Sequence, residues 1–123
     1  MNLIISGETP SKKNSKIMNT KTHRLFPSQK YKEWHDKAML QVLFQKSQSK
    51  EIFPITKCKI KLEFYHADNK RRDSDNGTSS IFDLLVDCGI LEDDNWQVVN
   101  RFEVENKKSE KKCSFVKIAI DTL

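Results

Sequence analysis

The sequence predicts one small α+β domain, spanning residues 1–123, with a mixed or antiparallel sheet of about four strands and two main helices. Three observations support this. The length of 123 residues suits a single core. Apolar residues alternate from Cys58 to Phe64, which is the two-residue period of a strand. They recur at helical spacing from Tyr31 to Val42 and from Ile81 to Cys88. Strands and helices in this order favour an α+β fold.

The N-terminal part predicts a strand, a long loop and a helix. Ile4 and Ile5 lie in a short apolar opening that indicates the first strand. Residues 8–27 are polar, basic and rich in turn formers, so we predict a basic loop there. Ser28 is the expected N-cap of a helix that runs to about Gln45. The buried stripe of this helix should consist of Tyr31, Trp34, Ala38 and Val42, widened by Met39 and Leu43.

The C-terminal part predicts three strands and a second helix. Residues 57–67 form a strand whose buried face is Cys58, Ile60, Leu62 and Phe64. The second helix should cover about 76–88, with Asp75 or Asn76 as N-cap and Gly89 just past its end. Residues 96–106 and 113–120, joined by 107–112, predict a hairpin. The residues that share one face would be Val98, Asn100, Phe102 and Val104 in the first strand and Val116, Ile118 and Ile120 in the second.

The cysteines and the hydropathy pattern favour a cytoplasmic protein. No apolar run approaches the 18 residues of a membrane span, and the opening has no basic segment typical of a signal peptide. Cys58, Cys88 and Cys113 are far apart and form no CxxC pair, which argues against a zinc site. We expect all three to be reduced core residues.

The charges are segregated along the chain. Residues 1–72 contain 16 Lys/Arg and 6 Asp/Glu, a net charge of +10, whereas residues 73–123 contain 6 and 11, a net charge of −5. Residues 73–94 hold seven acids and no Lys or Arg. A basic surface with a compact acidic spot suits a metal-dependent nuclease. Chance segregation on a solvated surface is the alternative explanation.

The stretch KRRDSDNGTSS, residues 70–80, is the most informative segment. In extended chain Asp73 and Asp75 point the same way, so together they can bind one Mg²⁺. A third carboxylate, from Glu92, Asp93 or Asp94, can return to the same site after the helix, and Asp94 is our choice; the alternative is that 92–94 is a plain acidic turn. Lys70, Arg71 and Arg72 would hold neighbouring phosphates, and the helix N-terminus at Asn76 would add backbone donors. The structural alternatives are that Asp75 is only an N-cap and that Asp73 only pairs with Arg71 or Lys70.

Four blocks of this sequence resemble the RusA-type Holliday-junction endonucleases, a family common in prophages. They are TPSKKNSK, FPSQKYKEW, RRDSDNGTSSIFDLL and GILEDDNWQV, and together they cover most of the chain. The resemblance implies a small RusA-like α+β homodimer that binds four-way or branched DNA and nicks it symmetrically with Mg²⁺, Mn²⁺ being possible. It implies no small-molecule cofactor. By position, Asp73, Asp75 and Asp94 match the catalytic and metal-binding carboxylates, and Arg72 and Asn76 match their neighbours. The predicted DNA-binding residues are Lys12, Lys13, Lys16, Lys70, Arg71, Arg72 and Asn76.

One position departs from the family pattern. The family usually has a lysine four residues after the second aspartate, where this chain has Ser79. A lysine there stabilises developing negative charge or holds the scissile phosphate. Two further hypotheses therefore remain open: a catalytically weak or inactive junction-binding module of the same fold, and an RNA-binding or protein-interaction domain that uses the basic surface.

Overall fold

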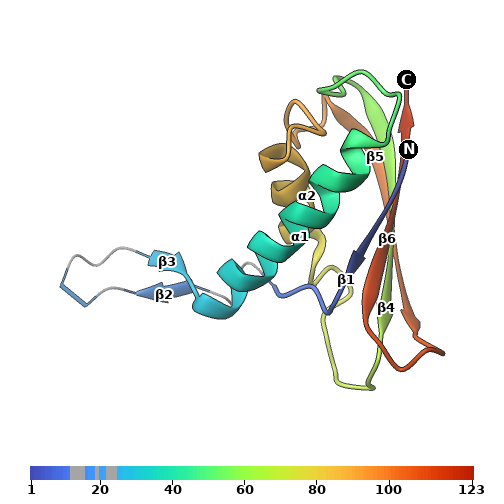
Figure 1. Cartoon of the computed structure of the whole chain (residues 1–123). Helices are drawn as coiled ribbons and strands as arrows, with labels where there is room; N and C mark the ends of the chain where they lie inside the picture. Colours follow the sequence, from blue (N-terminus) through green and yellow to red (C-terminus); the bar gives the residue numbers. More distant parts are fainter. Residues whose placement is uncertain (12–15, 19, 22–24) are drawn as a thin grey trace.

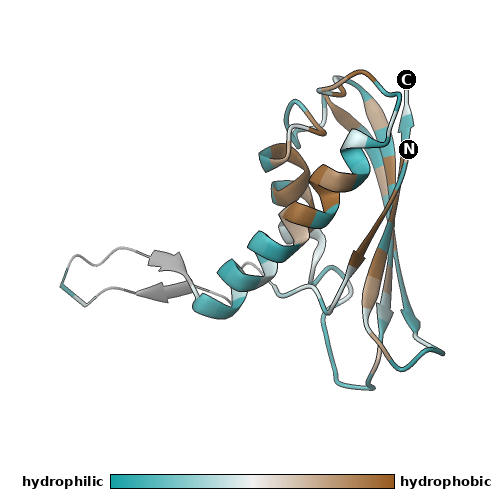
Figure 2. Ribbon diagram, in the orientation of Figure 1, coloured by the Kyte–Doolittle hydropathy of each residue, from teal (hydrophilic) through white to brown (hydrophobic). Residues whose placement is uncertain are grey.

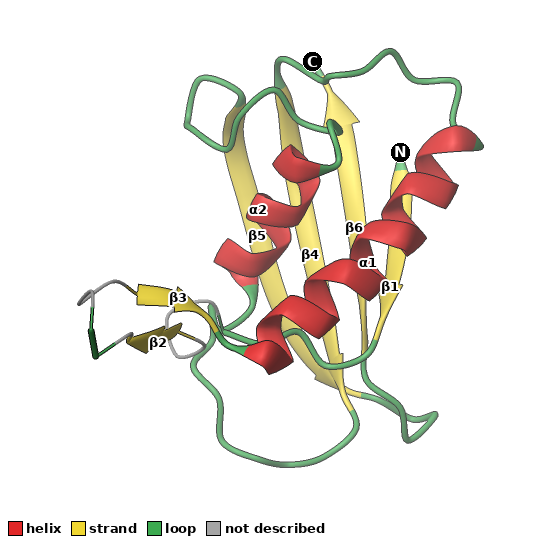
Figure 3. Ribbon diagram, turned by 60° about the vertical axis from the view of Figure 1, so that its left-hand side comes forward, coloured by secondary structure: helices red, strands yellow, loops and turns green. Residues whose placement is uncertain are grey.

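The computed structural model describes residues 1–11, 16–18, 20–21 and 25–123. A four-stranded sheet carries two helices on one of its faces, and a two-stranded ribbon projects from one end (Figures 1 and 3). The predicted α+β class is confirmed. The strands are β1 (Asn2–Ser6), β2 (Lys16–Met18), β3 (Leu25–Pro27), β4 (Cys58–His66), β5 (Val99–Lys108) and β6 (Phe115–Thr122), and the helices are α1 (Gln29–Ser47) and α2 (Thr78–Asp87).

Helix α1 forms as its sequence predicts. The Ser28 side chain accepts a hydrogen bond from the Tyr31 amide at 3.1 Å and so caps the first turn. The helix continues to Ser47, slightly beyond the predicted end. The four residues of the predicted stripe are buried and Met39 is partly buried, but Leu43 is 42% exposed, because the contact with the sheet is narrower than we expected. Within the described residues, no helix is long and apolar enough to cross a membrane.

The core lies between the helices and the sheet. All four predicted residues of β4 are buried, as are Leu3 and Ile5 of β1. Helix α2 is hydrophobic over most of its length and packs Ile81, Leu84 and Leu85 into the same core (Figure 2). Burying these branched and aliphatic side chains is the main stabilising contribution to the fold.

The predicted hairpin is wrong. The sheet order is β1-β6-β4-β5, so β4 lies between β5 and β6. β5 pairs with β4 in parallel, and β6 pairs with β4 antiparallel. A parallel neighbour requires a crossover, and α2 provides it. Because β5 is an edge strand, Asn100 is exposed and Phe102 remains 52% exposed although its ring packs edge-on against Phe82.

The loop predicted for residues 8–27 contains strand structure. β2 and β3 pair antiparallel, with Ile17 opposite Phe26. Each strand has three residues. Stretches this short show no alternating period, so the sequence pattern did not reveal them.

Two of the three cysteines follow the prediction. All three are free thiols; Cys58 and Cys88 are buried, and burial raises the pKa of the Cys88 thiol to about 11. Cys113 is exposed, contrary to our expectation, because it lies in the turn before β6 and outside the core.

Candidate catalytic loop

The loop of residues 67–77 connects the end of β4 to the start of α2. The Asn76 amide donates to the Asp73 carbonyl, and the Thr78 amide donates to the Asp75 carbonyl, each at 3.1 Å. Residues 74–77 are therefore turns, and the expected extended backbone through Asp73 and Asp75 is wrong. Ser, Asp, Asn and Gly favour turns, which explains the difference. The N-cap is Gly77 and makes no side-chain hydrogen bond, so neither Asp75 nor Asn76 caps the helix.

The Asp73 and Asp75 carboxylates are exposed and free. Neither forms a side-chain hydrogen bond or ion pair with any residue that the structure describes. The structural alternatives for them, a cap at Asp75 and an ion pair at Asp73, are thus not found. Their oxygen atoms are the ligand type that Mg²⁺ prefers, and Mg²⁺ commonly takes only one or two carboxylates from a protein and keeps several waters. This pair fits such an ion.

The segment of residues 8–10 packs against the loop and the start of α2. The buried Ser80 hydroxyl donates to the Pro10 carbonyl at 2.6 Å. A Cβ atom at Gly77 would lie only 2.9 Å from the Thr9 Cγ2 atom and 2.9 Å from the Phe64 Cε1 atom. A side chain at this position would therefore fit only if Thr9 and Phe64 moved apart.

We expect Gly77→Ala to destabilise the protein by about 1–3 kcal/mol, the usual cost of overpacking a well-packed site. The Cβ atom would force apart Thr9 and Phe64, and the turn that carries Asp75 would shift with them. Urea unfolding of the variant and the parent measures the change. Gly7→Ala is an unsuitable control because Gly7 has a φ of +91°. Ser74→Ala alters an exposed residue of the same loop and should change stability by less than about 0.5 kcal/mol.

Arg72 is held inside a network of acids. Its Nη1 and Nη2 atoms donate to the two Asp68 carboxylate oxygens at 2.8 and 3.2 Å, and its Nε atom lies 3.0 Å from Glu8 Oε1. The hydrogen bonds from Arg72 lower the pKa of the Asp68 carboxyl to about 2. Arg72 therefore fixes the residue before Asp73, whereas Lys70 and Arg71 are exposed cations. The predicted contact of Arg72 with DNA stays a prediction.

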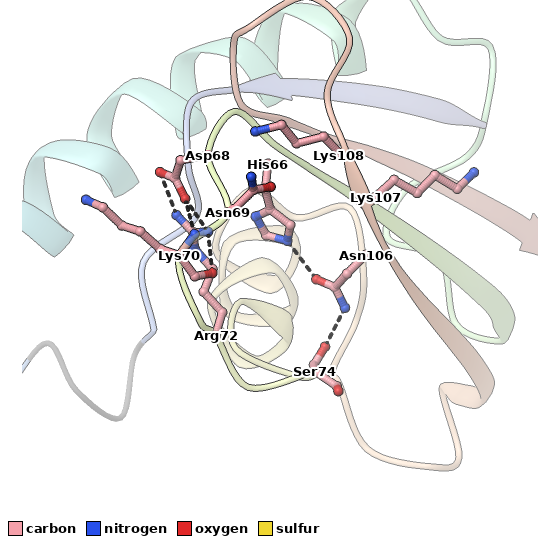
Figure 4. A pocket seen from close by; sticks show the side chains of 9 residues that line it. All are labelled: His66, Asp68, Asn69, Lys70, Arg72, Ser74, Asn106, Lys107 and Lys108. Atoms are coloured by element: carbon pink, nitrogen blue, oxygen red, sulfur yellow. Dashed lines mark hydrogen bonds and ion pairs between the residues drawn. The ribbon is translucent and has the colours of Figure 1, made fainter.

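A shallow cavity of about 280 Å³ lies beside this network (Figure 4). Asn106, at the end of β5, lies between His66 and Ser74 and bonds to both. The side chains of Lys70 and Lys107 point away from Asn106 in opposite directions. These contacts could not be predicted from sequence patterns, because Asn106 is far from His66 and Ser74 along the chain. The cavity is lined by His66, Asp68, Asn69, Lys70, Arg72, Ser74, Asn106, Lys107 and Lys108.

Asp94 lies in the segment between α2 and β5, beyond the other end of α2 from Asp73 and Asp75. A helix of ten residues is about 15 Å long. Partial burial, and then hydrogen bonding and repulsion from Asp93, raise the pKa of Asp94; the charge of Asp83 adds to this. No three His, Cys, Asp or Glu side chains of the described ranges are grouped closely enough to hold a metal ion. The structure thus places Asp73 and Asp75 on the loop before α2 and Asp94 in the segment after α2.

Comparison with known proteins decides the family. The family model for endodeoxyribonuclease RusA matches residues 7–121. The chain belongs to the RusA family. A search of curated proteins found no significant match. The resemblance seen in the sequence is confirmed, and the RusA match implies an endodeoxyribonuclease of the Holliday-junction-resolving type.

The RusA match covers every segment of the candidate site, including the acidic run 92–94. Ser79, at the position where the family usually has lysine, is exposed in the first turn of α2. Lys12 and Lys13 lie outside the described residues, and Lys16 belongs to β2 but its side chain is not described. Asn76 is half-buried at the helix start. Asp83, one of the seven acids of residues 73–94, lies in α2.

Proposed function

We propose that this protein is a Mg²⁺-dependent endodeoxyribonuclease that binds four-way or branched DNA and nicks it symmetrically. The observation that carries the proposal is that Asp73 and Asp75 are exposed on one loop and have no side-chain partner among the described residues, in a chain that matches RusA over residues 7–121. Exposed carboxylates are ligands that Mg²⁺ prefers, and Mg²⁺ commonly takes only one or two of them from a protein.

The candidate residues would have two roles, binding the metal ion and binding phosphate groups. Asp73 and Asp75 would hold Mg²⁺, or Mn²⁺, and Asp94 would be the third ligand. When bound, the ion would polarise a phosphoryl oxygen and lower the pKa of a water molecule. Asp94 follows α2, at the end opposite the loop, so its role as a ligand is the part of this assignment that rests on the RusA resemblance. The phosphate contacts would come from Lys12, Lys13, Lys16, Lys70, Arg71, Arg72 and Asn76.

A homodimer accounts for symmetric nicking. A two-fold dimer presents two identical sites, and resolving a four-way junction takes two equivalent cuts. The dimer is part of the proposal.

A second candidate is a junction-binding module with weak or no cleavage. Ser79 favours it, because no Lys or Arg occurs from Asp73 to Asn100 to replace the family's lysine. Lys12 and Lys13, which follow Pro10 in the sequence, would be the source of a compensating cation.

A binding competition tests the substrate class. We expect a four-way DNA junction, in Ca²⁺ to prevent cleavage, to outcompete a linear duplex of the same sequence and a matched RNA. The apparent affinity should fall with salt at a log–log slope of about −0.9 for each phosphate neutralised. Stronger competition by RNA than by the junction would favour the RNA-binding hypothesis instead.

A further inference from the structure

The peptide between the two candidate metal ligands is held from outside the loop. The Asn106 Nδ2 atom donates to the Ser74 carbonyl at 2.8 Å, and Ser74 separates Asp73 from Asp75 (Figure 4). Asn106 belongs to β5, where it pairs with Phe64 of the central strand β4. The sheet therefore provides a rigid point of attachment for the turn.

The contacts of Asn106 determine which atom its amide presents to His66. Because Nδ2 donates to a carbonyl, Oδ1 must face the His66 ring, and it lies 2.8 Å from Nε2. Nε2 must therefore donate. With the amide reversed, two oxygen atoms would face each other at 2.8 Å with no hydrogen between them.

The other ring nitrogen of His66 also faces an acceptor. His66 Nδ1 lies 2.6 Å from Glu8 Oε1, and the same oxygen lies 3.0 Å from the Arg72 Nε atom. His66 therefore joins Glu8 to Asn106 through its two ring nitrogens.

We propose that Asn106 and His66 are positioning residues for the metal-binding loop. The chain of contacts Glu8–His66–Asn106 holds the Ser74 carbonyl and so sets the directions in which Asp73 and Asp75 present their carboxylates. The inference rests on the proposed function, because it assigns a purpose to the same loop. Asn106 and His66 touch neither metal nor DNA in this scheme.

Two substitutions at Asn106 test the inference against matched changes at Asn100, an exposed residue at the opposite end of β5. Asn106→Ala removes both hydrogen bonds without adding charge. Asn106→Asp keeps the acceptor for His66 but turns an oxygen toward the Ser74 carbonyl. Asn100→Ala and Asn100→Asp reproduce the changes in size and charge at a residue whose side chain makes no hydrogen bond to the part of the chain that the structure describes.

Amide hydrogen exchange gives a result that does not depend on nuclease activity. The Asn76 and Thr78 amides close the two turns of the loop. We expect both to exchange at least about tenfold faster in the Asn106 variants and at the parent rate in the Asn100 variants. Unchanged exchange in Asn106→Ala would overturn the inference, whether or not the parent protein cleaves DNA.

Single-turnover cleavage gives the second result. Losing a group that orients metal ligands typically costs 10- to 100-fold in activity or metal affinity, so we expect about that loss for both Asn106 variants. The Mg²⁺ concentration for half-maximal rate should rise, while junction affinity in Ca²⁺ stays within about twofold of the parent for Asn106→Ala. Faster exchange with an unchanged rate and Mg²⁺ dependence would also overturn the positioning role. A parent protein that never cleaves would refute the proposed function alone, and hydrogen exchange would still decide the inference.

Discussion

Asp73→Asn should reduce cleavage of a four-way junction by about 10²- to 10³-fold, the loss typical of removing one group that stabilises transition-state charge. Asparagine keeps the size of the side chain but removes the negative charge that would bind the metal ion. Asp73 is exposed and has no partner among the described residues, so the fold should not depend on it. Single-turnover rates with Mg²⁺ measure the loss, and gel shifts in Ca²⁺ should show junction binding preserved.

Asp121→Asn is the matched control for that substitution. Asp121 is an exposed aspartate near the end of β6, away from the loop. Asp121→Asn makes the same change of charge, and the variant protein should cleave the junction at the parent rate. If Asp73→Asn cuts as fast as the parent, the metal site is misassigned.

Ser79→Lys should increase the cleavage rate by about 10- to 100-fold. A charged donor contributes about 1.5–3 kcal/mol through a hydrogen bond, and each 1.4 kcal/mol corresponds to a factor of ten in rate. Ser79 is exposed in the first turn of α2, four residues after Asp75, so a longer side chain fits without displacing the core. The rate constant under single-turnover conditions is the quantity to compare.

Ser79→Gln separates charge from length. Glutamine adds a longer polar side chain without positive charge, so it should leave the rate within about threefold of the parent. An equal gain from glutamine and lysine would show that charge at this position is not what the site lacks. No gain from lysine would indicate that another cation already serves the site, and Lys12→Ala would then be expected to lower the rate.

Single helices and strands were predictable where their own sequence shows a clear period of apolar residues. Helix α1 and strand β4 bury the side chains that their periods indicate. The pairing of the strands was not predictable, because the sequence patterns of β5 and β6 indicate strands but not which strands lie beside them. The crossover through α2 places β5 beside β4. The β2–β3 ribbon was missed because three-residue strands have no readable period.

The site was predictable in its residue types more than in its conformation. The sequence indicated Asp73 and Asp75 as a pair, but the Ser-Asp-Asn-Gly run folds as turns and not as extended chain. Glu8, His66 and Asn106 escaped sequence reasoning because their contacts join β4, β5 and the segment after β1. The structure does not group Asp94 with the loop, because Asp94 lies in the segment after α2. The role of Asp94 as a metal ligand stays a prediction.

The most direct test of the account is a cleavage assay of the parent protein on a synthetic four-way junction, labelled on each strand, in Mg²⁺, Mn²⁺ or EDTA, with Asp75→Asn alongside. We predict paired, symmetric nicks that require the metal and disappear in the variant. Tight junction binding with no nick in either metal would contradict the proposed enzyme and leave a DNA-binding protein on a nuclease fold.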